Sequence, residues 1–490
     1  MLFNSTIFLF VFLPLCGLGY WLILRFIGRY AAYAMLLLAS LTFYAWWDIG
    51  NLLLLLSLIL VNFFLGEHLR SPASQNSKVR RGWLIAGVTL NLAVLGVFKY
   101  SNFILANLAL VGVGNGSALS LLLPLGISFY TFQQIAYLID CWKGRVRNGR
   151  LVDYSLFVLF FPQLIAGPIV HHRYFFHHLR RRLGEKRIAF AWCGLALLLI
   201  GLFKKVVLAD NFALIAGPGF DQPQAGHSIW MAVIAYTLQI YFDFSGYSDM
   251  AIGLAALFGV RLPLNFSSPY RATSIVEFWR RWHITLSTFL RDYLYIPLGG
   301  NRNGRWQRQR NLMLTMLIGG VWHGASWNFI LWGALHGFYL SLNHGWHACG
   351  KLRQLWMRLP GHSLLGWTLT LLLVAWAWVP FRAPDLSTTL VIWQALLQGP
   401  AGSWAWPAFG ANLLPDLLEV HASTHIVWVL AGCSIVLLLP NSQTVVGYRQ
   451  DGVLPEMPSA ALMFGVTILG LLAIKAIISE VPSVFLYFNF

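Results

Sequence analysis

Long apolar segments, separated by short polar clusters, run along nearly the whole of this chain. Hydrophobic residues make up 58% of the 490 residues, and charged residues only 10%. The mean hydropathy is +0.65. Such a chain has room for on the order of ten spanning helices of roughly 20 residues each. The sequence therefore predicts an all-α, multi-pass membrane protein and excludes a water-soluble fold, with apolar spans at about 5–25, 31–47, 50–66, 83–98, 103–123, 152–170, 188–217, 228–242, 247–260, 311–341, 363–381, 426–440 and 458–479.

The charge balance is strongly basic, with 34 Lys and Arg against 17 Asp and Glu. In a soluble protein this would suggest a nucleic-acid partner. Here the basic residues form short clusters between apolar segments, as cytoplasmic loops facing anionic lipid do. The expected partner is therefore the lipid bilayer, and nucleic acid is not expected.

Two segments combine apolar and polar residues in a way that does not suit a complete crossing. They cover residues 123–140 and 277–300, and we expect both to be re-entrant or interfacial. Together, the charges of Arg280, Arg281, Arg291 and Asp292 in the second segment would cancel the insertion energy of a short apolar helix. If it is one amphipathic helix, Trp279 and His283 share its apolar side, and Glu277 can neutralise Arg281 at i, i+4.

A histidine in an otherwise apolar stretch marks the principal candidate site. His323 stands in the sequence GGVWHGASWN, residues 319–328. Ionisable side chains inside membranes are costly and are commonly functional, although a packing histidine bonded to a carbonyl group is the plain alternative. His283 is also beside a Trp, so we expect the two histidines to share a polar pocket. His336 comes thirteen residues after His323, about 20 Å along one helix, which is too far for direct contact. It is expected at the other end of that helix or on its neighbour, in a structural role.

Several long motifs resemble those of the membrane-bound O-acyltransferases. They are WRRWHITLSTFLRDYLYIPLGGNR (279–302), NLMLTMLIGGVWHGASWNFILWGALHG (311–337), YFDFSGYSDMAIG (241–253), LPLGISFYTFQ (123–133), FPQLIAGPIV (161–170) and GLFKKVVLAD (201–210). Within the family, the resemblance is greatest to the branch that acetylates alginate and other bacterial exopolysaccharides. It implies one membrane domain, 1–490, with about 11 transmembrane helices and re-entrant helices around a central tunnel. The motif-bearing core is about 1–345, and the C-terminal helices are about 363–490.

The resemblance also implies an activity. Acetyl would be taken from a cytoplasmic thioester, acetyl-CoA being the expected donor, and passed across the bacterial inner membrane. A separate periplasmic polysaccharide acetyltransferase of the SGNH type would complete the reaction, and no tightly bound cofactor is expected. The family's principal histidine falls on His323 and its second polar position on His283. A neutral imidazole can act as a general base or form a covalent acetyl-histidine, and we favour the base.

Other residues are assigned supporting roles in this interpretation. His283, the Trp322 indole or Asn328 could orient the base or donate to the developing oxyanion. Lys204 and Lys205 are expected to extend to an interface. No metal site is expected, because the paired histidines at 171–172 and 177–178 adjoin arginines and suit a basic juxtamembrane helix. Tunnel-lining or hydrogen-bonding positions are predicted at Asp243, Ser245, Asp249, Trp279 and His336, and donor binding at Arg280, Arg281, Arg302 and Arg305.

Alternative functions remain open at this point. The acyl group could instead be D-alanine, and the acceptor could be cellulose or peptidoglycan. In a different class, the intramembrane histidines could relay protons in a proton-coupled transporter. A GxSxG nucleophile elbow is absent from the sequence, which argues against a soluble hydrolase.

Overall fold

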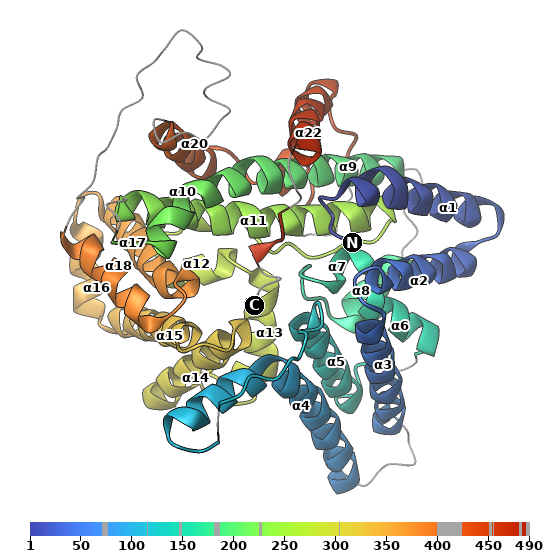
Figure 1. The fold of residues 1–490 in the computed structure, drawn as a ribbon, viewed down its shortest axis with the longest axis horizontal. Coiled ribbons are helices and arrows are strands. Elements are labelled where there is room, and N and C mark those ends of the chain that lie inside the picture. Colours follow the sequence, from blue (N-terminus) through green and yellow to red (C-terminus); the bar gives the residue numbers. More distant parts are fainter. Residues whose placement is uncertain are drawn as a thin grey trace. The chain divides into compact units, whose positions relative to one another are not determined.

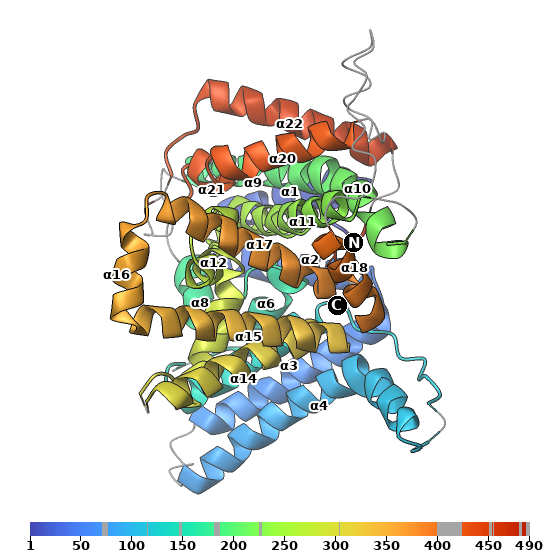
Figure 2. The same cartoon turned by 90° about the vertical axis from the view of Figure 1, so that its left-hand side faces the viewer.

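The computed structural model consists of helices and connecting segments (Figures 1 and 2). It describes residues 1–70, 77–114, 116–146, 149–180, 187–224, 228–302, 304–398, 424–449, 453, 455–479 and 483–486, and these ranges contain no strand. The expected all-α fold is confirmed for them. Helices suit a lipid solvent because each satisfies its backbone hydrogen bonds internally.

The chain separates into two compact units. The first comprises Met1–Leu202, Tyr247–Pro263 and Val446–Asn489, and the second comprises Phe203–Gly246 and Leu264–Val445. The helix α11 (Ile229–Leu257) contributes residues to both. The expectation of a single domain over 1–490 stays a prediction.

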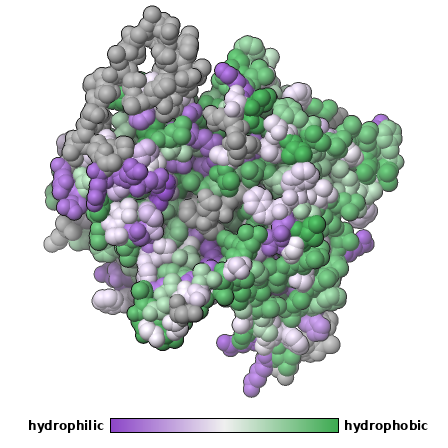
Figure 3. Space-filling model, viewed as in Figure 1, coloured by the Kyte–Doolittle hydropathy of each residue, from purple (hydrophilic) through white to green (hydrophobic). Residues whose placement is uncertain are grey.

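The first unit contains the N-terminal helices. They are η1 (Phe8–Phe12), α1 (Leu13–Phe26), α2 (Arg29–Ala45), α3 (Ile49–Arg70), α4 (Ser77–Leu110), α5 (Ile127–Trp142), α6 (Leu151–Leu159), α7 (Phe161–Leu164), α8 (His172–Arg180), α9 (Arg187–Phe203) and, near the C-terminus, α22 (Ala460–Ser479). Apolar side chains cover most of the surface over α1 and α2 (Figure 3), as expected for helices that face lipid.

Close helix contacts in the first unit depend on small and amide side chains. A Cβ on Gly194 of α9 would lie 2.7 Å from the carbonyl oxygen of Gly253 in α11. In the centre of the α3, α4 and α5 group, Asn62 donates to Gln134 at 2.7 Å, and Asn91 donates to Asn62 at 2.7 Å. Small residues and hydrogen bonds between side-chain amides are the usual means by which helices associate in membranes.

The second unit contains the histidines and aromatic residues of the candidate site described below. Its elements are η3 (Lys204–Ala209), α10 (Asp210–Asp221), the first part of α11, η4 (Pro269–Arg271), α12 (Ile275–Arg281), α13 (Ile284–Leu290), η5 (Arg291–Tyr295), α14 (Arg305–His323), α15 (Trp327–Ala348), α16 (Gly350–Arg358), α17 (His362–Arg382), α18 (Leu386–Gln398), α20 (His425–Leu438) and α21 (Ser442–Val445).

An antiparallel hairpin of α14 and α15 forms one side of the second unit (Figure 2). Glycines bring the two backbones together. A Cβ on Gly333 would lie 2.5 Å from the carbonyl oxygen of Met316, and one on Gly320 would lie 2.3 Å from that of Phe329. Ordinary side chains cannot occupy either position without separating the helices.

Six helices among the described residues are long and apolar enough to cross a membrane. They are Phe8–Phe26, Ile49–Arg70, Lys78–Leu110, Arg187–Asp221, His362–Arg382 and Ala460–Ser479. The chain is therefore a multi-pass membrane protein, as the hydropathy predicted.

Several predicted boundaries are wrong. Spans expected at 228–242 and 247–260 form the single helix α11, because the polar SGYSD sequence between them is buried and helical. The span expected at 83–98 and the first part of that expected at 103–123 likewise form α4, which ends at Leu110. Conversely, the span expected at 311–341 is two helices, since Gly324 adopts an extended conformation after His323. Hydropathy alone does not separate a continuous helix from a tight hairpin.

Candidate active site

His323 is the last residue of α14 and lies at the turn of the hairpin. The extended Gly324 ends the helix, and the Ser326 side chain accepts a hydrogen bond from the Asn328 backbone N–H to begin α15. Only 3% of His323 is exposed. Its ring centroid lies 4.9 Å from that of Trp332 and 5.1 Å from that of Phe381. The imidazole therefore lies in an aromatic pocket built from α14, α15 and α17.

His336 also contacts Trp332, with ring centroids 4.8 Å apart. His336 lies on the neighbouring helix, one of the two places expected for it, because the hairpin folds α15 back along α14. The Trp279 indole N–H donates to His336 Nδ1 at 3.3 Å. An indole nitrogen can only donate, so the proton of the neutral His336 ring is on Nε2.

His283 lies between α12 and α13 and is fully buried. Its backbone has a φ of 42°, in the left-handed region that side chains rarely occupy. Nδ1 lies 3.0 Å from the side-chain oxygen of Asn265, and the ring packs against Phe244 at 4.7 Å. His283 and His323 both contact the Trp322 ring, at 6.3 Å and 5.0 Å. The structure therefore brings the two predicted histidines to one indole.

Burial controls the protonation of two of these histidines. Desolvation lowers the pKa of His283 to about 3 and that of His336 to about 3. Both residues lie outside the six candidate spans. Because a charged imidazole is costly in this environment, both rings are neutral at pH 7.

The prediction of one amphipathic helix through Trp279 and His283 is wrong. The helix ends at Arg281, whose carbonyl group accepts from the Ser267 backbone N–H at 2.9 Å. The Ile284 N–H donates to the Asn265 carbonyl group at 3.0 Å. These contacts with the preceding segment replace the helical hydrogen bonds at this point. The expected ion pair of Glu277 and Arg281 is confirmed, at 2.6 Å.

The Asn328 side chain bonds to groups beyond α15, and its expected role at the imidazole stays a prediction. Its side-chain amide donates to the carbonyl oxygen of Ala383 at 2.8 Å, and its oxygen lies 3.5 Å from the Thr389 hydroxyl. It thereby ties the start of α15 to α18 and to the end of α17. Trp322 is 5% exposed and remains at the His323 ring.

Asp243 belongs to a buried ion cluster that the sequence did not predict. Lys205 Nζ lies 2.7 Å from Asp243 and 2.9 Å from Asp210. Lys204 donates to the Ser442 hydroxyl at 2.9 Å. Both lysines are buried, so the expectation that they extend to an interface is wrong, because carboxylate and hydroxyl partners compensate them inside. The only feature of the sequence that pointed to this cluster was the pair of lysines within an apolar run.

Ser245 and Asp249 are buried, at 1% and 0% exposure, on the same helix as Asp243. Ser245 belongs to the second unit and Asp249 to the first. Their place in the site stays a prediction. The structure thus supports a buried position for each, which a hydrogen-bonding role requires.

The four arginines proposed for donor binding lie on or near the surface. Arg280, Arg302 and Arg305 are exposed, and Arg281 is half-buried in its pair with Glu277. Among the described residues, no group of three His, Cys, Asp or Glu side chains could hold a metal ion.

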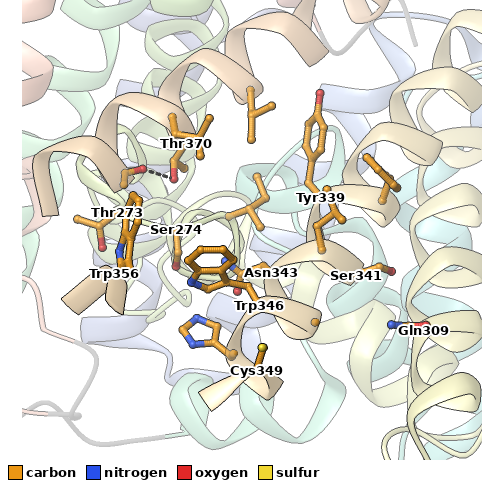
Figure 4. Close-up of a pocket in the computed structure, with 18 of the residues that line it drawn as sticks. Thr273, Ser274, Gln309, Tyr339, Ser341, Asn343, Trp346, Cys349, Trp356 and Thr370 are labelled. Atoms are coloured by element: carbon orange, nitrogen blue, oxygen red, sulfur yellow. Dashed lines mark hydrogen bonds between the residues drawn. The ribbon is translucent and has the colours of Figure 1, made fainter. Parts of the chain in front are cut away.

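A cavity of about 1210 Å³ opens beside the hairpin, within the second unit. Its lining includes Trp346, Trp356, Tyr339 and Arg310, the first three of which border the space in Figure 4. The Tyr339 ring is 5.7 Å from that of His336. Tyr339 thus connects the wall of the cavity with the aromatic pocket, and the cavity is large enough for part of a cofactor-sized ligand.

Comparisons with known proteins agree with this arrangement. The profile of the membrane-bound O-acyltransferase family matches residues 145–379. The chain is 40% identical to the peptidoglycan O-acetyltransferase of Helicobacter pylori, over 100% of this chain and 98% of that protein. It is 42% identical to a probable alginate O-acetylase of Pseudomonas aeruginosa, over 82% of this chain and 76% of that one. The teichoic acid D-alanyltransferase of Streptococcus thermophilus is 30% identical over 46% of this chain and 58% of its own length.

Proposed function

This chain belongs to the membrane-bound O-acyltransferase family, and from that premise we propose that it takes acetyl from acetyl-CoA for O-acetylation of a bacterial exopolysaccharide such as alginate. His323 is the proposed catalytic base. The observation that carries this choice is the position of the ring, which is almost fully buried at a hairpin turn between Trp332 and Phe381. A base sheltered from bulk water is suited to taking a proton from a hydroxyl.

The proposed reaction is direct acyl transfer. The oxygen of a hydroxyl acceptor attacks the thioester carbonyl carbon, while its proton passes to His323. The C–S bond then breaks, and the same proton neutralises the leaving thiolate. His283 is proposed to assist from the other side of Trp322, since both imidazoles contact that ring.

We assign the donor to the cavity beside α14 and α15. Coenzyme A has apolar stretches and several negative charges, and the cavity offers indole surfaces together with Arg310. Arg302 and Arg305 lie at the start of the same helix, α14, and would attract the phosphates. Arg280 and Arg281 are weaker candidates for attracting the donor phosphates.

Peptidoglycan is the second candidate acceptor. The relative named peptidoglycan O-acetyltransferase aligns with 100% of this chain, whereas the alginate relative covers 82% of it. D-alanine is disfavoured as the acyl group, because the relative named for it matches less than half of this chain.

The location and partner follow from the same proposal. We place the protein in the bacterial inner membrane, with acetyl-CoA on the cytoplasmic side and the polymer outside. A separate periplasmic acetyltransferase of the SGNH type would complete polymer modification. If the purified chain alone acetylates the polymer in proteoliposomes, this partner is unnecessary and that part of the proposal fails.

Thiol release from acetyl-CoA by purified protein in proteoliposomes tests the activity. We expect release that depends on a hydroxyl acceptor and falls at least about 100-fold in His323→Gln. His344→Gln removes a half-buried ring from α15 outside the aromatic pocket and is the matched control. Unchanged turnover in His323→Gln would refute the role of this base.

Two alternatives give different results in the same assay. If acetyl is relayed covalently, mass spectrometry of protein quenched without acceptor finds acetyl on His323. If the protein is a proton-coupled transporter, acetyl-CoA is not consumed, and a pH gradient drives solute movement instead.

A further inference from the structure

Three buried N–H groups near His323 have no hydrogen-bond acceptor among the described residues. They are the indole N–H groups of Trp332 and Trp378 and the Nε2 of His336. The exposed fractions of these residues are 1%, 0% and 0%. An unsatisfied buried donor is expensive, and native proteins rarely keep one without an acceptor that binds during function.

The three rings are mutual neighbours. Trp332 and His336 have centroids 4.8 Å apart, Trp332 and Trp378 are 6.1 Å apart, and His336 and Trp378 are 6.3 Å apart. They come from two helices, α15 and α17, and Trp332 also contacts the His323 ring. Three donors therefore gather beside the proposed base.

The tautomer of His336 makes its Nε2 a hydrogen-bond donor. Because Trp279 donates to Nδ1, the neutral ring carries its proton on Nε2. Trp279 is thus a positioning residue: it fixes which nitrogen of His336 donates, without itself belonging to the group of three.

Asn328, one of the residues expected to supply this function, is occupied elsewhere, and so is the neighbouring Trp279. The Asn328 amide donates to Ala383, and the Trp279 indole to His336. Neither is available to a ligand in this arrangement. Trp332, His336 and Trp378 keep buried N–H groups without an acceptor in the described part of the chain, and the sequence singled out none of the three as an oxyanion donor.

We propose that the N–H groups of Trp332, His336 and Trp378 bind the carbonyl oxygen of the acyl thioester and stabilise the oxyanion that forms from it. This inference rests on the proposed function. As the acceptor oxygen bonds to the carbonyl carbon, the C=O electron pair moves onto the carbonyl oxygen, which accepts from these donors. The pair returns when the C–S bond breaks. Donors placed in advance where charge develops are among the largest contributions to acyl-transfer rates.

Kinetics of Trp332→Phe and Trp378→Phe test the proposal, because each keeps an apolar ring and removes only the N–H. We expect kcat to fall on the order of 100-fold, with KM for acetyl-CoA changed less than about threefold. Trp393→Phe is the matched control, since that indole N–H already donates to the Trp376 carbonyl group. Equal kcat values in Trp332→Phe, Trp378→Phe and the control would overturn the proposal.

Infrared spectroscopy of a bound ketone gives a readout that needs no turnover. S-acetonyl-CoA places a ¹³C-labelled ketone near the thioester position and cannot transfer acetyl. We expect its carbonyl stretch to move to lower wavenumber on binding the wild type, less in Trp332→Phe and Trp378→Phe, and less in Trp279→Phe, where His336 can change tautomer. This pattern would not arise from a purely structural role.

The outcomes separate the two proposals. Binding with the same carbonyl frequency in all variants means that the N–H groups serve ordered water, which overturns this inference and leaves the proposed function standing. Failure of the wild type to bind either acetyl-CoA or the ketone removes the donor assignment and this inference together.

Discussion

The Nδ1 of His283 lies 3.0 Å from the side-chain oxygen of Asn265. The same oxygen accepts from the Thr285 hydroxyl at 2.9 Å and lies 3.3 Å from the Thr285 backbone N–H. An amide oxygen can only accept, so the proton of the neutral His283 ring is on Nδ1. Asn265 thus leaves the lone pair of this buried imidazole on Nε2, the nitrogen that could accept a proton.

Replacing Asn265 by Asp should change the protonation of His283. A carboxylate 3 Å from the ring favours the imidazolium and raises its pKa. If the reaction needs a neutral His283, the acid limb of the pH profile of thiol release moves upward by about one unit or more. A pH profile identical to that of the wild type would remove His283 from the reaction.

Replacing Asn265 by Ala should destabilise the protein. It leaves buried donors of Thr285 and His283 without this acceptor, and each such loss costs about 1–3 kcal/mol. Asn211→Ala loses only a local bond to the Val207 carbonyl group and is the control. Thermal unfolding in detergent should show the larger decrease in melting temperature for Asn265→Ala, and equal decreases would contradict this account.

The stability of the protein should fall as the pH falls below about 6.5. Burial lowers the pKa of His283 and of His336 to about 3 in the folded state. Between pH 6.5 and 3 the unfolded chain therefore binds more protons, and each histidine costs up to about 1.4 kcal/mol per pH unit. Above pH 7 the effect is absent.

Melting temperatures measured from pH 8 to pH 5 show whether stability falls with falling pH and whether His283 is a cause. His283→Gln should reduce the slope, and His347→Gln, which removes an exposed ring from α15, should leave it unchanged. A slope that persists in full in His283→Gln would assign the acid sensitivity to other groups.

Sequence patterns predicted the features that local interactions decide. Long apolar runs became α3, α17 and α22, because the length and hydropathy of one segment suffice for a helix in lipid. The pair of Glu277 and Arg281 followed from helical spacing alone. The placement of His323 at the end of a helix was not predicted, although Gly324 was visible.

Features that depend on distant partners were missed. The break at His283 needs contacts from Asn265, eighteen residues earlier. The burial of Lys205 needs Asp243, which is thirty-eight residues later. The contact of His323 and His336 with one Trp332 ring needs the hairpin to close. Hydropathy and spacing carry no information about such partners, because tertiary packing decides them.

The buried pair of Lys205 and Asp243 should be important for stability. Lys205→Met removes the cation 2.7 Å from a carboxylate that is 2% exposed. Losing one member of such a pair costs about 3–5 kcal/mol, whereas removing both is less costly. The double variant Lys205→Met with Asp243→Leu should therefore be more stable than Lys205→Met alone.

Lys204→Met provides the comparison for this pair. It removes a hydrogen bond from the lysine ammonium group to the uncharged Ser442 hydroxyl and a cation–π contact with Tyr241, so a loss of about 1–2 kcal/mol is expected. Thermal unfolding of the four proteins checks the order. If the double variant is less stable than Lys205→Met, the ion pair is not the source of the loss.

A single methyl group at Gly333 should separate the active-site helices. Its Cβ would lie 2.5 Å from the Met316 carbonyl oxygen, which belongs to the backbone of α14 and cannot rotate away. The helices must move apart, which shifts Trp332 relative to His323. We expect Gly333→Ala to lower both the melting temperature and acetyl transfer, the latter about tenfold or more, because small displacements of reacting groups are costly.

Gly345→Ala distinguishes helix contact from helix propensity. Gly345 is on the same helix, α15, and nothing lies within 4 Å of its would-be Cβ. Alanine there should be neutral or stabilise the helix by up to about 1 kcal/mol, with kcat for transfer unchanged. Gly345 lines the cavity assigned to the donor, so any effect on transfer should be confined to KM for acetyl-CoA. If Gly333→Ala behaves like Gly345→Ala in both assays, close approach of α14 and α15 does not hold Trp332 against His323, and the proposed site loses its structural basis.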